Sequence, residues 1–204
     1  KDLGKTIRRA KQVPALIHYF VKSQSYIKEP DNFDHKILQN IDSLSIPYLI
    51  PAVRMPEGDE ARRNDPIGVT HVHHFYTRRN LYALASFAAK QSSTRNTINV
   101  SSVATVITRM YRFRSQGGSL GAGGGPLSGT LYIPSLSKEI PVSKVLGEHI
   151  KKWIVVQKLK KIFLGSFIAT GSAVRLSAIS DNSVDYVFTD PPFGANISYS
   201  ELNF

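Results

Sequence analysis

The chain has 204 residues, of which 42% are hydrophobic and 10% aromatic, and this composition excludes a disordered tail. The absence of cysteine excludes disulfide bonds and thiolate metal sites and fits a cytoplasmic protein, and no apolar run approaches the roughly 20 residues that a membrane-spanning helix needs. The net charge of +11 is unevenly spread: residues 95–175 hold twelve Lys or Arg against two acids, whereas residues 181–204 hold four acids and no base. The basic block predicts a polyanionic partner, with a basic surface that serves solubility as the alternative.

The first predicted elements are short. Residues 2–12 place apolar side chains at helical spacing, and Pro14 is expected to end that helix because it restricts the residue before it. The segment ALIHYFV, residues 15–21, is aromatic and β-branched and predicts a strand. Residues 31–43 predict a helix whose N-terminus is capped by Asp31.

The middle of the chain mixes clear and ambiguous patterns. Four prolines punctuate residues 47–68, which predicts an irregular connection. Thr77 is placed to cap a helix that runs to about Lys90. Residues 98–116 are ambiguous, because their β-branched side chains favour a strand while their length allows a helix. The segment TLYIP, residues 130–134, predicts a strand.

The last third of the chain predicts a helix followed by two strands. The helix is expected over residues 142–163, with Trp153 on its buried face. The two strands are short and apolar, at residues 165–171 and 184–190, and the turn signal SDNS lies between them. This succession of helix, strand, connection and strand predicts an α/β fold class.

The sequence TDPPFG, which follows the last predicted strand, has a restricted backbone. Pro191 and Pro192 fix their own φ angles, and Asp190 is kept out of the helical region by the proline after it. Because the proline nitrogens carry no hydrogen, the Asp190 carboxylate and the Pro191 carbonyl remain available as acceptors. Phe193 adds an aromatic face, and Gly194 allows close approach of the backbone. Two acceptors beside a ring suit a planar ligand with an amino group, at the end of a strand where open α/β sheets bind ligands.

TDPPFG resembles the Asp/Asn/Ser-Pro-Pro-aromatic loop of amino-group DNA methyltransferases, which follows the fourth strand of their sheet. The longer stretch SDNSVDYVFTDPPFG is similar too, and four other segments resemble parts of large bacterial site-specific adenine methylases: RMPEGDEARRND, THVHHFYTRRNL, GGPLSGTLYIPSLS and ISYSELNF. The resemblance therefore covers much of the chain. It implies a fragment of a larger bacterial enzyme, with part of a Rossmann-like S-adenosylmethionine-dependent methyltransferase fold and a mixed α+β inserted region.

The resemblance also implies a role for each residue of the loop. Asp190 and the Pro191 carbonyl would accept hydrogen bonds from the target amine and direct its lone pair at the methyl group of S-adenosylmethionine. Phe193 would stack on a base flipped out of the DNA, beside Pro192 and Gly194. Aspartate at the first position favours adenine over cytosine. A strand-ending turn without chemistry is the alternative interpretation.

The cofactor-binding part of the resemblance is incomplete. The Gly-rich loop 117–129 precedes a predicted strand rather than a helix, so it is expected to be a flexible loop near the nucleic acid. The main S-adenosylmethionine loop is then expected to lie outside this chain. Gly171 and Ser172 occupy a cofactor-binding position, although related proteins often carry an acid where Ser172 stands. The chain alone is therefore expected to bind the cofactor weakly and to be inactive.

Other histidines and arginines have competing interpretations. His71, His73 and His74 could be metal ligands by residue type, but a structural or hydrogen-bonding role is the preferred interpretation, and no metal is expected. Three arginines of the basic block are expected to contact DNA phosphates: Arg109, Arg112 and Arg114. Four more arginines could contact phosphates or pair with acids nearby, and their spacing leaves both open: Arg62, Arg63, Arg78 and Arg79.

Two regions are predicted on this basis. Residues 1–141 would form an inserted, target-recognition-like region, and residues 142–204 an incomplete helix–strand–strand portion of the methyltransferase domain. The function that the resemblance implies is methyl transfer to the exocyclic amine of adenine in DNA, with the rest of the parent chain, as in restriction–modification systems. The alternatives are an RNA or protein-amide methyltransferase and a non-catalytic basic DNA-binding module.

Overall fold

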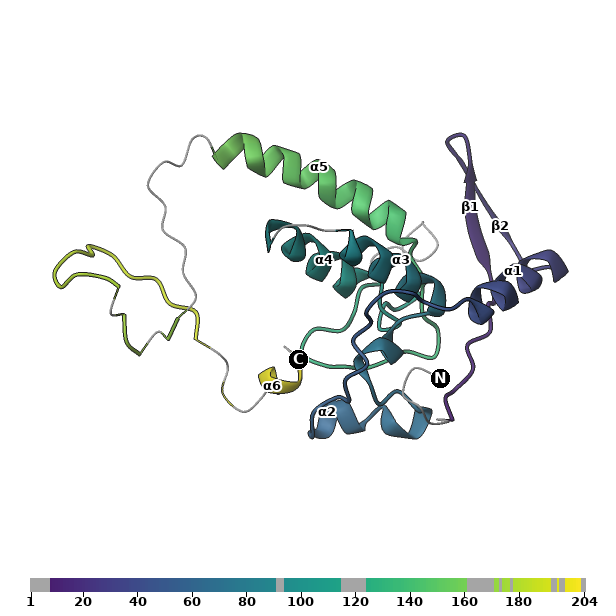
Figure 1. The fold of residues 1–204 in the computed structure, drawn as a ribbon, viewed down its shortest axis with the longest axis horizontal. Helices are drawn as coiled ribbons and strands as arrows, with labels where there is room; N and C mark the ends of the chain where they lie inside the picture. Colours follow the sequence, from purple (N-terminus) through teal and green to yellow (C-terminus); the bar gives the residue numbers. More distant parts are fainter. Residues whose placement is uncertain are drawn as a thin grey trace.

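The computed structural model of this chain has a mixed α/β architecture with one small antiparallel sheet and several helices (Figure 1). It describes residues 8–90, 94–114, 124–160, 171–172, 174–176, 178–191, 194 and 197–202. The elements, in chain order, are β1 (Ile17–Val21), β2 (Gln24–Lys28), α1 (Asn32–Ser43), α2 (Asp59–Arg62), η1 (Asp65–Ile67), η2 (Val72–Phe75), α3 (Arg78–Ala89), α4 (Thr94–Val106), α5 (Val142–Lys160) and α6 (Tyr199–Leu202). Within the described ranges, no helix is both long and apolar enough to cross a membrane.

The strand predicted at residues 15–21 is confirmed as β1, but its partner β2 was not predicted. The two strands pair antiparallel, with Tyr19 opposite Tyr26, and the two tyrosine rings stack with centroids 5.5 Å apart. The tight turn uses Lys22 with φ of 56°, a conformation that glycine or asparagine usually supplies. The usual hairpin signal is therefore missing from the sequence, which explains why β2 was overlooked.

Local capping fixes the starts of two helices as predicted. Asp31 accepts hydrogen bonds from the backbone N–H groups of Phe33 and Asp34, at 2.9 and 3.0 Å, and the Asp34 carboxylate accepts from the Asp31 N–H. Thr77 accepts from the N–H of Asn80 at the start of α3. These reciprocal bonds satisfy donors that a helix terminus would otherwise leave unpaired, and they need no tertiary contact.

Helices α3, α4 and α5 form one of two apolar clusters. The ambiguous residues 98–116 are helical through the end of α4 and irregular from 107 to 114, and Val103 in the helix and Ile107 just after it are buried. They pack against Val142 and Val145 at the start of α5, so this cluster joins the two regions predicted as 1–141 and 142–204. Tertiary packing therefore overrides the strand preference of the β-branched residues.

The second cluster is built largely from irregular chain. Met55, Ala61, Val69 and Phe75 of the proline-rich connection and of η2 bury their side chains against Leu131. Helices α2, η1 and η2 are each a single turn, which agrees with the predicted irregular connection. The two clusters meet at Tyr76, which packs against both.

The strand predicted at residues 130–134 is wrong. Leu131 donates its N–H to the Glu60 carboxylate at 2.9 Å, and its carbonyl accepts from the Asn64 side-chain amide at 3.0 Å. Side chains thus take the backbone hydrogen bonds that a neighbouring strand would otherwise provide, and the segment joins no sheet.

The helix predicted at residues 2–12 is also wrong over its described part, residues 8–12, which are irregular. The N–H of Ala10 donates to the carbonyl of Ile67 at 2.9 Å, a long-range bond that a helix would not allow. The lower-numbered half of that prediction lies outside the described residues.

The strand predicted at residues 184–190 does not form. These residues are irregular and exposed, and the only sheet among the described residues is the β1–β2 pair. A strand needs a neighbour to accept its hydrogen bonds, and no described residues pair with this segment as a strand. The strand predicted at 165–171 lies outside the described residues except for Gly171, so the Rossmann-like sheet remains an expectation.

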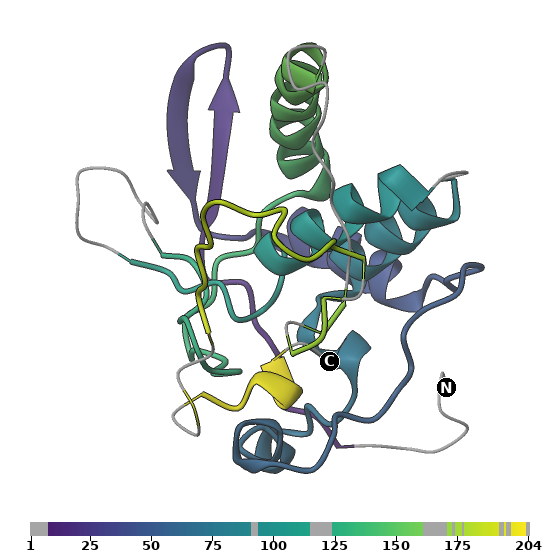
Figure 2. The ribbon, with the colours of Figure 1, turned by 90° about the vertical axis from the view of Figure 1, so that its left-hand side faces the viewer.

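The hairpin, helix α5 and the C-terminal segment stand out from the packed body. Figure 2 shows the hairpin and α5 extending to the same side, while the described, yellow-green residues between 171 and 191 follow an irregular path. Helix α6 lies beside the body near α2 (Figure 1), and it connects that segment to the second cluster.

Candidate functional site

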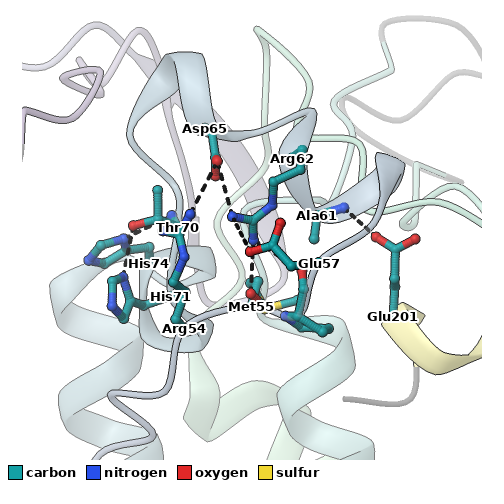
Figure 3. Close-up of polar contacts among 11 residues, drawn as sticks. Arg54, Met55, Glu57, Ala61, Arg62, Asp65, Thr70, His71, His74 and Glu201 are labelled. Carbon is teal, nitrogen blue, oxygen red and sulfur yellow. Dashed lines mark hydrogen bonds and ion pairs between the residues drawn. The ribbon is translucent and has the colours of Figure 1, made fainter.

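The residues with the most polar contacts lie around the proline-rich connection (Figure 3). The Arg62 guanidinium donates to the carbonyls of Met55 and Pro56, at 2.8 and 3.0 Å, and lies 3.2 Å from the carboxylate of Asp65 and 3.5 Å from that of Glu57. One half-buried side chain therefore holds the two ends of residues 55–65 together.

The other arginines left open by the sequence also have protein partners. Arg63 pairs with Glu60, and Arg79 lies 3.1 Å from Glu139. Arg78 donates to the carbonyl of Leu44 at the end of α1. Pairing with acids is therefore seen for Arg62, Arg63 and Arg79, whereas Arg78 donates to a backbone carbonyl.

Glu201 anchors the C-terminal helix α6 to this region. Its side chain is buried, and the carboxylate accepts from the N–H of Ala61 at 2.7 Å across 140 residues of sequence (Figure 3). Gly58, at the N-cap of α2, has φ of 157° and faces the same carboxylate, so any larger residue there would displace Glu201. The chain that follows the TDPPFG loop is thus attached to the body.

Glu60, the neighbour of Ala61, anchors a different segment. Its carboxylate accepts from the Thr130 hydroxyl and from the N–H of Leu131. Burial works to raise the pKa of Glu60, but these bonds together with the charge of Arg63 outweigh it, so the pKa is lowered and the group stays ionised. Glu60 and Glu201 together hold two sequence-distant segments against α2.

Four of the segments that carry the resemblance, not including the TDPPFG loop, therefore lie in one place. Residues 54–65, 70–81, 124–137 and 197–202 all contribute to the second cluster or to its polar border. Neither Glu60 nor Glu201 was predicted as a site residue, because nothing in local sequence spacing connects positions so far apart.

Three buried histidines lie at the centre of this assembly. The rings of His71, His73 and His74 have centroids 4.3–5.9 Å apart. Thr70 contacts two of them: its hydroxyl lies 2.8 Å from His71 Nδ1, and its N–H donates to His74 Nδ1 at 3.2 Å (Figure 3). Among the described residues, no group of three or more His, Asp or Glu side chains is arranged to hold a metal ion.

The surroundings of His74 favour its neutral form. Burial, followed by the nearby His73, Arg9, His71 and Arg109, lowers its pKa from 6.5 to about 4. Because Nδ1 accepts the Thr70 N–H, the neutral ring carries its proton on Nε2, and protonating Nδ1 would set two donors against each other. This histidine is therefore a structural acceptor at neutral pH.

Arg109 was predicted to contact phosphate but is buried in the same assembly. Its guanidinium donates to the carbonyl of His74 at 3.0 Å, and burial, then the charge of Arg9, lowers its pKa to about 10. Arg112 is half-buried and donates from Nε to the carbonyls of Gly124 and Gly125, both at 3.1 Å. Arg114, by contrast, is exposed and remains a candidate for phosphate contact.

The predicted catalytic loop lies outside this assembly. Asp190, Pro191 and Gly194 are exposed, and Gly194 has φ of 67°, a left-handed conformation that favours glycine. Pro192 and Phe193 lie outside the described residues. The described residues of the loop are exposed, and further along the chain Glu201 of α6 is bonded to the body.

The predicted cofactor residues are exposed as well. Gly171 and Ser172 are in an irregular stretch, where the Ser172 hydroxyl accepts from the N–H of Val174 at 3.3 Å. The hydroxyl is therefore engaged in a local turn, and the described residues around it do not enclose a cofactor. The Gly-rich loop is described only from Gly124, where Arg112 fixes its end.

Comparisons with protein families, with characterised proteins and with solved structures give no match to this chain, so the assignment of a function depends on its own residues.

Proposed function

We propose that this chain is the target-base-binding part of a cytoplasmic, bacterial, S-adenosylmethionine-dependent methyltransferase that acts on the exocyclic amine of adenine in DNA. The observation that carries the proposal is the Asp190–Gly194 sequence, in which two acceptors and an aromatic ring are held on a proline-stiffened backbone. Two structural facts support it: the described part of this loop is exposed, and the residues directly after it are anchored by Glu201.

The chemistry of this loop follows from its acceptors. The adenine amine has two hydrogens, and the Asp190 carboxylate and the Pro191 carbonyl can accept one each. These bonds draw the nitrogen lone pair away from conjugation with the ring and make the nitrogen a better nucleophile. Because neither proline carries an N–H, neither proline nitrogen competes for the acceptors.

S-adenosylmethionine would supply the methyl group, but the described residues do not fit it by themselves. Gly171 and Ser172 are exposed and form no enclosure. The role of this chain in the proposal is therefore to bind and orient the base, while the remaining polypeptide of the enzyme holds the cofactor.

The test compares two exposed carboxylates of the same segment in the complete enzyme. Asp190→Ala is expected to abolish methyl transfer to a DNA duplex in single-turnover experiments with labelled cofactor, while DNA binding persists because phosphate contacts supply most of the affinity. Asp181→Ala, nine residues earlier, removes an equal charge outside the loop and is the matched control. Near-normal transfer by Asp190→Ala would refute the base-orienting role.

A further inference from the structure

Helix α5 extends beyond the body that it packs against. Val142 and Val145 at its start are buried, and His149 Nδ1 lies 2.8 Å from the Ser102 hydroxyl of α4. The same stripe of the helix continues through Trp153 and Val156, at helical spacing, where these side chains are 38% and 48% exposed. About two turns of apolar helix surface are therefore left without a covering layer.

Residues 150–156 of α5, called the overhang below, also carry apolar side chains on an adjoining face. Ile150, Ile154 and Val155 are each about half exposed. Between residues 149 and 156 the helix also carries Lys151 and Lys152 and no acid. A contiguous exposed patch of this kind, bordered by charge of one sign, is typical of a binding surface rather than of scattered surface residues.

A second uncovered apolar surface lies further along the chain. Val184, Tyr186 and Phe188 are 51%, 80% and 81% exposed, and in an extended backbone these alternate residues lie on one face. Residues 178–191 also carry three acids, Asp181, Asp185 and Asp190, and no base. This segment thus matches the overhang of α5 in apolar character and is opposite to it in charge.

We propose that the segment 184–188 docks, in an extended conformation, on the overhang of α5 formed by residues 150–156 of the same chain. The Val184, Tyr186 and Phe188 face would cover Trp153 and Val156, and Asp185 would lie toward Lys151 and Lys152. This inference depends on the two exposed surfaces alone and holds whether or not the chain takes part in methyl transfer.

The connection between the two surfaces permits this contact within one molecule. Residues 161–183 can span on the order of 75 Å when extended, at about 3.3 Å per residue, whereas the overhang is only about 10 Å long. A tether of this kind gives an effective concentration on the order of millimolar, which favours the same chain over a second copy at ordinary protein concentrations.

Docking would also fix both ends of the exposed loop. Asp190 follows Phe188 by two residues, and Glu201 already attaches the downstream side to α2. With 184–188 held on α5, the loop would be bracketed by two anchors, and its backbone would lose less conformational freedom when a ligand binds.

The single tryptophan of the chain, Trp153, is a direct reporter of this contact. In the full chain its fluorescence is expected to be blue-shifted and protected from acrylamide, and Tyr186→Ser with Phe188→Ser is expected to shift the emission to the red and increase quenching. Val187→Ser is the matched control, since Val187 lies on the opposite face of the extended segment. Equal spectra for the double variant and the unaltered chain would overturn the proposal.

A crosslink distinguishes an intramolecular contact from association of two chains. The chain has no cysteine, so Val156→Cys can be combined in turn with Val184→Cys, Tyr186→Cys and Phe188→Cys, and oxidised at low concentration. A monomeric disulfide product in at least one pair, with none for Val156→Cys combined with Val187→Cys, is expected. Only disulfide-linked dimers, or no disulfide with any of the three, would refute the docking of 184–188 on its own α5.

Discussion

The body around η2 and the described residues between 171 and 191 both carry apolar side chains, but these side chains are buried in the body and exposed in the segment. Phe75 in the body is 4% exposed, whereas Phe188 in the segment is 81% exposed. In the body, polar side chains such as Glu60, Asn64 and Arg62 supply hydrogen bonds to irregular backbone, which allows that backbone to be buried without regular structure. In the described part of the segment, the side-chain bonds to the backbone are local, as between Ser172 and Val174, and the apolar side chains are exposed.

The difference shows what burial of an irregular chain requires. Apolar side chains alone do not bury a segment, because its N–H and C=O groups must be satisfied at the same time. The body meets this requirement with side chains from distant positions, such as Glu201, which reaches Ala61. Docking on the overhang of α5 would instead cover one apolar face of the segment and leave its backbone groups at the border, where water can still pair them.

The largest expected effect on the free energy of unfolding comes from replacing a buried phenylalanine, compared with replacing an exposed one. Phe75→Ala should lower the free energy of unfolding by about 3–5 kcal/mol, because it leaves a cavity in the second cluster. Phe188→Ala should cost clearly less than this, because Phe188 lies outside both packed clusters and only the proposed contact with α5 would be lost. Urea denaturation followed by circular dichroism compares the two, and equal losses would contradict the division into packed body and exposed segment.

The next prediction compares the stability effects of replacing two acids: Glu201, which follows the proposed base-binding loop, and Asp190, which belongs to it. Glu201→Ala should lower the free energy of unfolding by about 1–3 kcal/mol, because it leaves the Ala61 N–H buried without an acceptor. Asp190→Ala should leave thermal unfolding unchanged, since its carboxylate is exposed. If Glu201→Ala unfolds at the same temperature as the unaltered chain, α6 does not anchor the loop.

The pH dependence of stability should originate in the body. Because the folded-state pKa of His74 is about 4 and the ordinary value is 6.5, the unfolded chain binds a proton in this interval and the folded chain does not. Stability is therefore complete above pH 6.5 and is lost as the pH falls toward 4. His74→Gln, followed by denaturation between pH 7.5 and 5, should flatten this dependence. A dependence unaltered by His74→Gln would point to other groups.

The smallest effect concerns the arginines expected to contact DNA. Arg114→Ala should weaken duplex binding and reduce the slope of log affinity against log salt by about 1, because it removes one phosphate contact. Arg109→Ala should instead destabilise the fold, since Arg109 is buried against the His74 carbonyl. Fluorescence anisotropy at several salt concentrations measures the slope, and an unchanged slope for Arg114→Ala would remove Arg114 from the interface.

The sequence by itself determined the elements whose signals are local. The caps of Asp31 and Thr77, the apolar spacing at the start of α5 and the β-branched run of β1 each need only neighbouring residues, and each was predicted close to its observed place. The restricted backbone of Asp190 and Pro191 is local in the same sense, because proline geometry is covalent.

Only the tertiary structure decided the remainder. Whether residues 130–134 and 184–190 become strands depends on a neighbour that no local pattern encodes, and in one case side chains of Glu60 and Asn64 took the place of a strand. Likewise, Arg109 has the sequence character of a phosphate ligand, yet it is buried beside His74, because the fold brings a carbonyl to its guanidinium. Long-range pairing of this kind is set by which segments pack together, and single positions in a sequence do not record it.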